Sequence, residues 1–311
     1  MSWNSRKAII GTRGSTLALW QSNWVADRLR DAHPGLAVEL TIIKTTGDKF
    51  QEASLPAIGK GAFTKEIQEA LLRGEVDLAV HSLKDLPTTG PQGLRVWAFP
   101  ARFDPRDAWI GRSGALYTAL PDRAVIATGA LRRTAQVKHR YPQATVEALR
   151  GNIDTRLKKL KAGTMTGMFL AAAGLKRLGL EPEITEILDP ALFLPAPGQG
   201  ALAIEGRVDD ATAALLSPLD DPDTRDQVTA ERALLATLEG GCQVPIAALA
   251  RLEQDDLVLD GLVADLEGKT LIRDQARGPR AKARAIGEKL AARLVEQGAD
   301  RILRALRQES R

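Results

Sequence analysis

Short apolar runs and longer amphipathic runs alternate along the first hundred residues. Strand-like apolar runs cover residues 7–11, 37–43 and 76–80. Helical spacing begins at Ser15 and again at Thr64, and turn residues end both runs. The expected apolar face of the first helix consists of Leu17, Trp20, Trp24 and Leu29. This alternation of strands with helices predicts a parallel or mixed α/β sheet.

The same alternation resumes after residue 104 and changes character after residue 220. Strands are predicted at 125–127, 145–148 and 168–172, with one helix carrying Arg132 and Arg133 and another over 153–161. Beyond residue 220 the pattern predicts a helix (224–238), three strands (246–252, 257–263, 270–276) and two final helices (279–297, 299–308). That last part is typical of a small α+β domain with an antiparallel sheet.

Polar clusters follow several of the predicted strands. They occupy residues 12–15, 84–85, 128–133 and 150–156. Ligands of open α/β sheets bind beyond the carboxyl ends of the strands, where free amides and helix dipoles favour anions. Each Thr, Ser or Asn alone is explained by helix capping. The recurrence of arginine at these junctions instead predicts an anion cleft between two α/β units.

Composition and charge narrow the class of protein. The 311 residues suggest about two domains, and 44% hydrophobic with 26% charged residues is ordinary for a globular protein. No run approaches the ~18 apolar residues of a membrane helix, and the N-terminus has no apolar signal core, so a cytoplasmic protein is expected. The net charge is +4, yet residues 102–177 hold ten Arg and five Lys against five acids, a local charge of +10.

The basic middle segment predicts an anionic partner. Aromatic residues are only 4%, without the basic–aromatic pattern that stacks bases, so nucleic acid is not favoured. Arg outnumbers Lys, and its planar fork matches the carboxylates of a small polyanion. One cysteine and three scattered histidines predict no metal site. The run Gly59–Lys60–Gly61 lacks the full phosphate-loop pattern, so ATP binding is not expected.

Two residues carry open alternatives. Asp85 follows a predicted buried strand and is either a surface group, a helix cap, a catalytic acid, or an anion that stabilises a developing cation. Cys242 lies in the run Glu-Gly-Gly-Cys-Gln-Val-Pro after a helix. A lone cysteine is usually a small buried hydrophobe, whereas a loop thiol can be a nucleophile or an attachment point.

Nine collinear motifs resemble the porphobilinogen deaminase (hydroxymethylbilane synthase) family. They are IGTRGS (10–15), KGAFTKE (60–66), VHSLKDLP (80–87), DPRDA (104–108), LRR (131–133), RGNIDTR (150–156), AGLKRLG (173–179), LPAPGQG (194–200) and LEGGCQVP (238–245). The resemblance runs from about residue 8 towards the C-terminus and is weakest after residue 250.

The resemblance implies three domains and a defined reaction. Residues 1–100 with 199–218, and residues 101–198, would form two α/β domains like type II periplasmic binding proteins. Residues 219–311 would form a small α+β domain. The implied activity is that of a transferase, which condenses four porphobilinogen molecules stepwise into the linear tetrapyrrole hydroxymethylbilane and releases ammonia each time. A dipyrromethane cofactor would be attached to Cys242 through a thioether.

Matching positions also imply roles for single residues. The catalytic carboxylate would be Asp85. The cofactor-binding residues would be Cys242, Lys84, Ser15, Thr128, Gly129, Arg132, Arg133 and Arg150. The substrate-binding residues would be Arg13, Arg156 and Arg177. The expected partner is porphobilinogen alone, bound by a monomer without nucleic acid, membrane or metal.

Two departures from the family pattern and two rival functions stay open. Gly129–Ala130 stands where the family often has two serines, and Thr166–Gly167–Met168 replaces an Asp-Ala pair. The first removes two hydroxyl donors, and the second bears on local packing. A non-enzymatic, two-lobed binding protein for small anions is the main alternative and would need neither Cys242 nor Asp85. A nucleic-acid-binding protein is the other.

Overall fold

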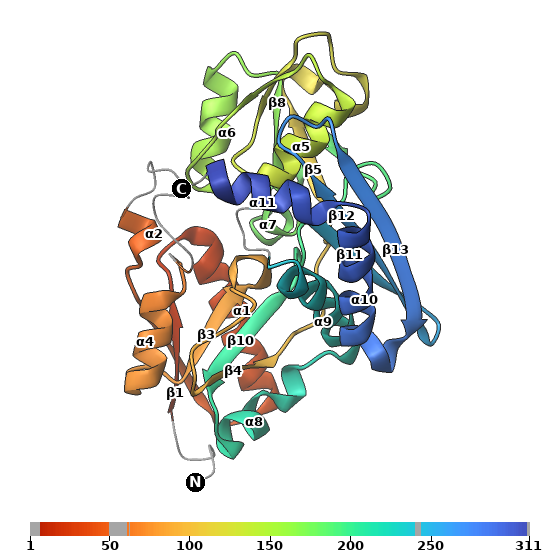
Figure 1. The fold of residues 1–311 in the computed structure, drawn as a ribbon. Helices are drawn as coiled ribbons and strands as arrows, with labels where there is room; N and C mark the ends of the chain where they lie inside the picture. The colour runs from red at the N-terminus through yellow and green to blue at the C-terminus, as the bar shows by residue number, and fades with distance from the viewer. Residues whose placement is uncertain (1–6, 50–60, 62, 240–243, 310–311) are drawn as a thin grey trace. The chain divides into compact units, whose positions relative to one another are not determined.

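A computed structural model describes residues 7–49, 61, 63–239 and 244–309 of the chain (Figure 1). The fold divides into two compact units. Unit 1 comprises residues 1–103 and 200–225, and unit 2 comprises residues 104–199 and 226–311. The chain therefore passes between the units after residues 103, 199 and 225.

Unit 1 is built on a five-stranded sheet in the order β2-β1-β3-β10-β4. Its strands are β1 (Lys7–Thr12), β2 (Ala37–Ile42), β3 (Leu78–Ser82), β4 (Leu94–Ala98) and β10 (Leu202–Arg207). The first three are parallel, and β10 runs antiparallel to both of its neighbours. The helices are α1 (Thr16–Ala32), α2 (Thr46–Lys49), α4 (Lys65–Arg73) and α8 (Asp210–Leu216).

Helix α1 buries a different face from the one that the sequence predicted. Its buried residues are Gln21, Ser22, Val25, Ala26 and Leu29. Of the predicted apolar residues only Leu29 is buried, whereas Leu17, Trp20 and Trp24 are half-buried. Trp20 and Trp24 instead pack edge-on against Phe103, with ring centroids 5.8 and 6.1 Å apart. Trp24 also packs against the buried core of the first sheet, so the predicted face overlaps the observed one at Trp24 and Leu29.

Unit 2 repeats the sheet pattern of unit 1 in the order β7-β6-β8-β5-β9. Its strands are β5 (Asp107–Gly111), β6 (Val125–Ala127), β7 (Thr145–Glu147), β8 (Gly167–Ala171) and β9 (Glu186–Ile187). Strands β7, β6 and β8 are parallel, and β5 is antiparallel to β8 and β9. Helices α5 (Leu131–Arg140), α6 (Ile153–Ala162) and α7 (Ala172–Arg177) connect them. Two α/β sheets of one pattern confirm the predicted fold class.

The Gly167 departure has a packing explanation. Trp109, Tyr117, Phe169 and Phe193 form a fully buried aromatic cluster on this sheet. A Cβ atom at Gly167 would lie 2.1 Å from Cζ2 of Trp109. The indole ring of Trp109 therefore occupies the space that a side chain at position 167 would need.

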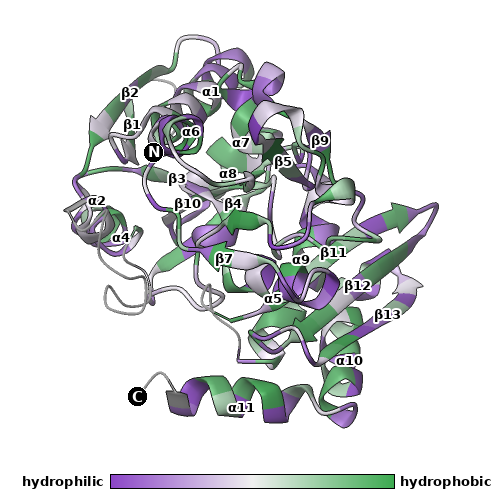
Figure 2. Cartoon of the chain, turned by 90° about the horizontal axis from the view of Figure 1, so that it is seen from above, coloured by the Kyte–Doolittle hydropathy of each residue, from purple (hydrophilic) through white to green (hydrophobic). Residues whose placement is uncertain are grey.

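The C-terminal part of unit 2 is an antiparallel sheet covered by helices. Strands β11 (Ile246–Glu253), β12 (Asp256–Ala264) and β13 (Leu271–Pro279) pair in that order. Helices α9 (Pro222–Thr237), α10 (Ala283–Glu296) and α11 (Ala299–Glu309) complete it, and hydrophobic residues are concentrated on β12 (Figure 2). This arrangement confirms the predicted α+β region, although β13 extends into the start of the helix expected at 279.

Packing explains why the second sheet and the C-terminal sheet group together in unit 2. Ala135 of α5 and Leu194 share one buried cluster with Ala247, Leu249 and Leu262 of the antiparallel sheet.

Short 3₁₀ turns link the larger elements, at Leu83–Asp85, Arg112–Gly114, Tyr117–Ala119, Glu181–Glu183, Ser217–Leu219 and Arg280–Lys282. We keep the division into three domains, 1–100 with 199–218, 101–198 and 219–311, as a proposal.

Candidate active site

The turn after β3 presents Lys84 and Asp85 at the carboxyl edge of the first sheet. The turn is fixed from below, because Leu83 and Leu86 are buried and the Leu83 amide donates to the Ala201 carbonyl at 3.0 Å. Asp85 is exposed and Lys84 is half-buried. The backbone of this turn is therefore anchored while its carboxylate faces outward, as a group that meets a ligand must.

Arg13 and Ser15 lie at the same edge, because β1 is the parallel neighbour of β3. Ser15 caps α1, and its hydroxyl accepts from the Ala18 amide at 3.3 Å. The capping interpretation of Ser15 is thus correct, and its implied cofactor contact stays a prediction. The edge of unit 1 brings together four of the predicted site residues.

The Arg13 guanidinium is held by a carboxylate and an aromatic ring. Its Nη2 and Nε atoms donate to Oδ1 of Asp48 at 2.5 and 3.1 Å. Its Cζ atom lies 4.3 Å from the ring centroid of Phe63. Burial raises the pKa of Asp48, but hydrogen bonds from Arg13 and Thr45 outweigh that effect and hold this pKa below its ordinary value. Asp48 therefore stays ionised beside Arg13.

The carboxyl edge of the β7-β6-β8 strands carries several of the predicted residues of unit 2. Thr128 follows β6, Arg150 follows β7, and Arg177 ends the helix after β8. The Thr128 hydroxyl accepts from the Ala130 amide at 3.2 Å, so the start of α5 keeps one side-chain acceptor despite the missing serines. The Arg156 Nε donates to the Gly151 carbonyl at 2.7 Å, which fixes the start of α6.

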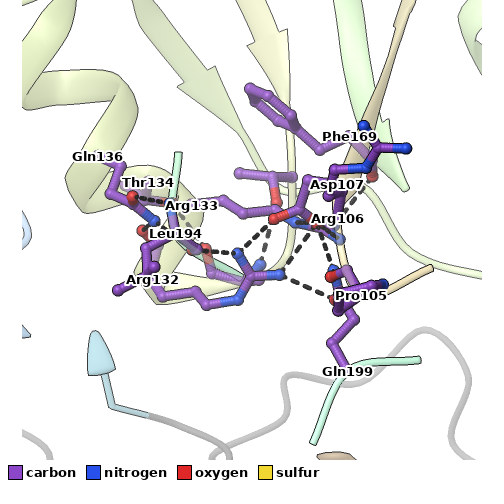
Figure 3. A network of polar contacts seen from close by, with 12 residues as sticks. Pro105, Arg106, Asp107, Arg132, Arg133, Thr134, Gln136, Phe169, Leu194 and Gln199 are labelled. Atoms are coloured by element: carbon purple, nitrogen blue, oxygen red, sulfur yellow. Dashed lines mark hydrogen bonds and ion pairs between the residues drawn. The ribbon is translucent and has the colours of Figure 1, made fainter. Parts of the chain in front are cut away.

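Arg132 and Arg133 share one fully buried carboxylate, that of Asp107 (Figure 3). Nη1 of Arg132 lies 2.7 Å from Oδ2 of Asp107, and Nη2 of Arg133 lies 2.6 Å from Oδ1. Burial alone would raise the pKa of Asp107, but the two guanidiniums reverse that effect and hold this pKa well below its ordinary range. One carboxylate between two guanidiniums leaves a net positive charge in the cluster.

Burial lowers the pKa of two arginines of unit 2. Desolvation lowers the pKa of Arg133 to about 10, although Asp107 opposes this shift. Desolvation likewise lowers the pKa of Arg177 to about 10. Both guanidiniums stay protonated near pH 7, and each is held at a cost in desolvation.

Sequence reasoning missed three residues that hold the predicted arginines. Asp48 pairs with Arg13, and Asp107 pairs with Arg132 and Arg133. The side-chain Oε1 atom of Gln199 accepts from Nη2 of Arg132 at 3.1 Å. A signal for Asp107 was present, because two adjacent arginines on a helix that packs against a sheet need a buried counter-charge.

Three of the residues singled out in the sequence are not among the described residues, and two further predictions concern metal sites and membrane helices. Cys242, Gly59 and Lys60 lie outside the described part of the chain. Within residues 7–49, 61, 63–239 and 244–309 there is no group of three or more His, Cys, Asp or Glu side chains able to hold a metal ion. In the same residues, no helix has the length and apolar character required to cross a membrane.

Known proteins resemble this chain over nearly its whole length. Residues 8–214 match the family described as "Porphobilinogen deaminase, dipyromethane cofactor binding domain", and residues 226–296 match "Porphobilinogen deaminase, C-terminal domain". The porphobilinogen deaminase of Syntrophotalea carbinolica is 51% identical over 299 residues, which cover 96% of this chain and 95% of the relative. That of Syntrophobacter fumaroxidans is 50% identical over 296 residues, covering 94% and 96%.

Solved structures align less closely. The periplasmic aliphatic sulphonate binding protein SsuA from Escherichia coli aligns with a TM-score of 0.39 at 11% identity, over 75% of this chain and 70% of that chain. Likeness at this level adds nothing to the argument about function. The two family matches and the relatives at about half identity decide the assignment. The chain belongs to the porphobilinogen deaminase family.

Proposed function

We propose that the chain carries out its family's reaction with Asp85 as the catalytic carboxylate and the strand-edge arginines as carboxylate binders. It is a transferase of tetrapyrrole biosynthesis that joins four porphobilinogen molecules into hydroxymethylbilane. The observation that carries the assignment of residues is the anchored turn at Lys84–Asp85, which lies at the same sheet edge as Arg13 in a chain that matches the family over residues 8–214 and 226–296.

The donors at the strand edges fit the dipyrromethane cofactor. Pyrrole rings with acetate and propionate arms are polycarboxylates, and guanidinium forks bind carboxylates through two parallel hydrogen bonds. Arg150 and Arg156 are half-buried at the edge of the second sheet, and Lys84 is half-buried at the edge of the first. When bound, the dipyrromethane supplies the pyrrole carbon to which the first substrate ring is joined. We propose that Cys242 holds it.

Asp85 stabilises the positive charge that develops on the substrate. As the substrate's C–N bond breaks, ammonia leaves and positive charge spreads onto the pyrrole nitrogen. A new C–C bond then forms, and the attacking ring carbon loses its proton. A carboxylate on an anchored turn stabilises such charge without having to reorganise. Because the backbone of the turn is tied to Ala201, Asp85 keeps its place through successive additions.

The arginines bind the carboxylate arms while this chemistry proceeds. Arg13, Arg156 and Arg177 are proposed substrate binders. Ser15, Lys84, Thr128, Gly129, Arg132, Arg133 and Arg150 are proposed cofactor binders. Each charge-assisted hydrogen bond is worth about 1.5–3 kcal/mol, so several together fix a flexible polycarboxylate.

The experiment is to incubate the purified chain with porphobilinogen and measure ammonia and tetrapyrrole together. We expect one ammonia for each porphobilinogen consumed and one linear tetrapyrrole for four. Tight binding of porphobilinogen without ammonia release would instead support a non-enzymatic anion-binding protein.

We propose further that the enzyme is a cytoplasmic monomer that acts without nucleic acid. The low aromatic content of 4% supports the last point, because base stacking needs aromatic side chains. Light scattering during size exclusion should give the mass of one chain. An oligonucleotide titration at low salt should leave turnover unchanged, and salt-sensitive inhibition would contradict the proposal.

A further inference from the structure

Gln199 is fully buried and bridges the arginine cluster to the backbone (Figure 3). Its Nε2 atom donates to the Pro105 carbonyl at 2.8 Å and to Oδ1 of Asp107 at 3.1 Å. Its Oε1 atom accepts from Nη2 of Arg132 at 3.1 Å. One side chain therefore contacts the guanidinium, the guanidinium's counter-ion and the backbone next to that counter-ion.

Only a neutral amide can make this set of contacts. The guanidinium offers donors alone, so its neighbour must accept, whereas the carboxylate and the carbonyl accept alone, so their neighbour must donate. Reversing the amide would turn its NH₂ group towards Arg132 and its oxygen towards Asp107. The surroundings thus fix the amide in one orientation, and the amide in turn fixes the guanidinium plane.

The position of Gln199 in the chain gives the bridge a second consequence. Gln199 is the last residue of unit 2 before the chain enters unit 1, and residue 104 is the first residue of unit 2. The bond from Gln199 to Pro105 ties these two segments of unit 2 together. The chain enters unit 2 next to Pro105 and leaves it at Gln199. The hydrogen bond between these two residues therefore helps to set the plane of the Arg132 guanidinium.

We propose that Gln199 is a positioning residue for Arg132 and, through Asp107, for Arg133. It sets the plane of the Arg132 guanidinium, whose Nη1 and Nη2 hold Asp107, and as a neutral group it leaves the cluster's charge positive. This proposal rests on the proposed function, in which the two arginines bind the cofactor's carboxylates. In this role Gln199 acts through its hydrogen bonds to Arg132 and Asp107.

A matched control exists on the neighbouring helix. Gln136 is also buried, and its hydrogen bonds go to backbone atoms: the Leu194 carbonyl and amide at 3.0 and 2.7 Å, and the Arg132 carbonyl at 3.2 Å. Gln199→Met and Gln136→Met each replace a buried amide with an apolar side chain of similar size. The loss of buried hydrogen bonds is comparable, but only Gln199→Met removes a contact with the guanidinium.

The experiment measures three properties of each purified variant: the fraction carrying the dipyrromethane by intact mass, KM and kcat for porphobilinogen, and Tm. Both variants should lose Tm to a similar extent. Gln199→Met should also lose cofactor loading, or raise KM, by about tenfold, since hydrogen bonds to charged groups carry affinity of that size. Gln136→Met should load normally. Equal loading and equal KM in the two variants would overturn the proposal.

Gln199→Asn keeps the test decisive if Gln199→Met does not fold. The shorter side chain keeps a neutral amide and adds no buried charge, but it is one methylene too short to reach Arg132, Asp107 and Pro105 together. We expect cofactor loading to fall in Gln199→Asn and to stay normal in Gln136→Asn, and equal loading of these two variants would contradict the proposal. A wild-type chain that released no ammonia from porphobilinogen would refute the proposed function itself. Wild-type turnover with normally loading Gln199 variants would refute only the role of Gln199.

Discussion

Arg13 and Asp48 form a two-pronged ion pair at the carboxyl edge of the first sheet, with Nη2 and Nε of Arg13 at 2.5 and 3.1 Å from Oδ1 of Asp48. The hydroxyl of Thr45 donates to the other carboxylate oxygen at 2.8 Å. Thr45 therefore orients the Asp48 carboxylate, and this carboxylate orients the Arg13 guanidinium. Asp48 thus engages Nε and Nη2 of Arg13 and sets the plane of the guanidinium.

Asp48→Asn should raise KM for porphobilinogen about tenfold with a smaller change in kcat, because Arg13 loses the charge that orients its fork. Steady-state kinetics with porphobilinogen measure both constants. The control is Asp27→Asn, which removes an exposed ion pair with Arg30 on α1 of the same unit. A KM unchanged by Asp48→Asn would mean that Asp48 does not position Arg13. A lowered KM would mean that it competes with substrate.

Asp107→Asn should destabilise the protein strongly near pH 7, by about 3–5 kcal/mol, because two buried guanidiniums lose their counter-ion. The pKa of Asp107 in the folded chain lies well below that in the unfolded chain, about 3.9. The stabilisation is therefore present above about pH 4 and is lost as the pH falls below it. Urea denaturation at several pH values measures this. If the difference in free energy of unfolding between wild type and variant stayed constant down to pH 3, Asp107 would not be the counter-ion of the two arginines.

Asp85→Asn should fold, keep its cofactor and turn over about 10²–10³-fold more slowly, since one electrostatic stabiliser is removed. Asp85→Glu should keep part of the activity because the charge survives at a shifted position. The control, Glu75→Gln, removes an exposed carboxylate of the same unit and should turn over normally. A structural role for Asp85 predicts the reverse pattern, a lower Tm with normal turnover.

Gly167→Ala should lower stability by about 1–3 kcal/mol, because the new methyl group overlaps the Trp109 ring. Gly278→Ala, also in a strand, meets its nearest neighbour at an ordinary 3.4 Å and should change stability little. In the double variant Gly167→Ala/Trp109→Phe, the two effects should be less than additive. Strict additivity in thermal denaturation would show that the two positions do not compete for space.

The sequence predicted the strand edges well because local patterns determine them. The apolar run before His81 and the polar residues after it were sufficient to place Lys84 and Asp85 at the end of a strand. Likewise, the helix predicted from residue 153 begins there as α6, although the side chain of the preceding Asn152 makes no capping hydrogen bond.

Partners brought together by the sheet were not predictable in the same way. Asp107 lies 25 residues before Arg132 and opens β5, a strand that the pattern did not single out. Gln199 lies 67 residues beyond Arg132. Their contacts depend on β5 pairing antiparallel to β8, and no local pattern encodes that register.

We propose that this chain builds a tetrapyrrole on a cofactor that it carries covalently. The decisive experiment is an intact-mass measurement of the purified protein before and after a brief exposure to porphobilinogen. We expect a starting mass above that of the sequence by about two pyrrole units, absent in Cys242→Ser, and then a ladder of further single-pyrrole additions. An active protein with the bare mass of its 311 residues, and no ladder, would contradict it.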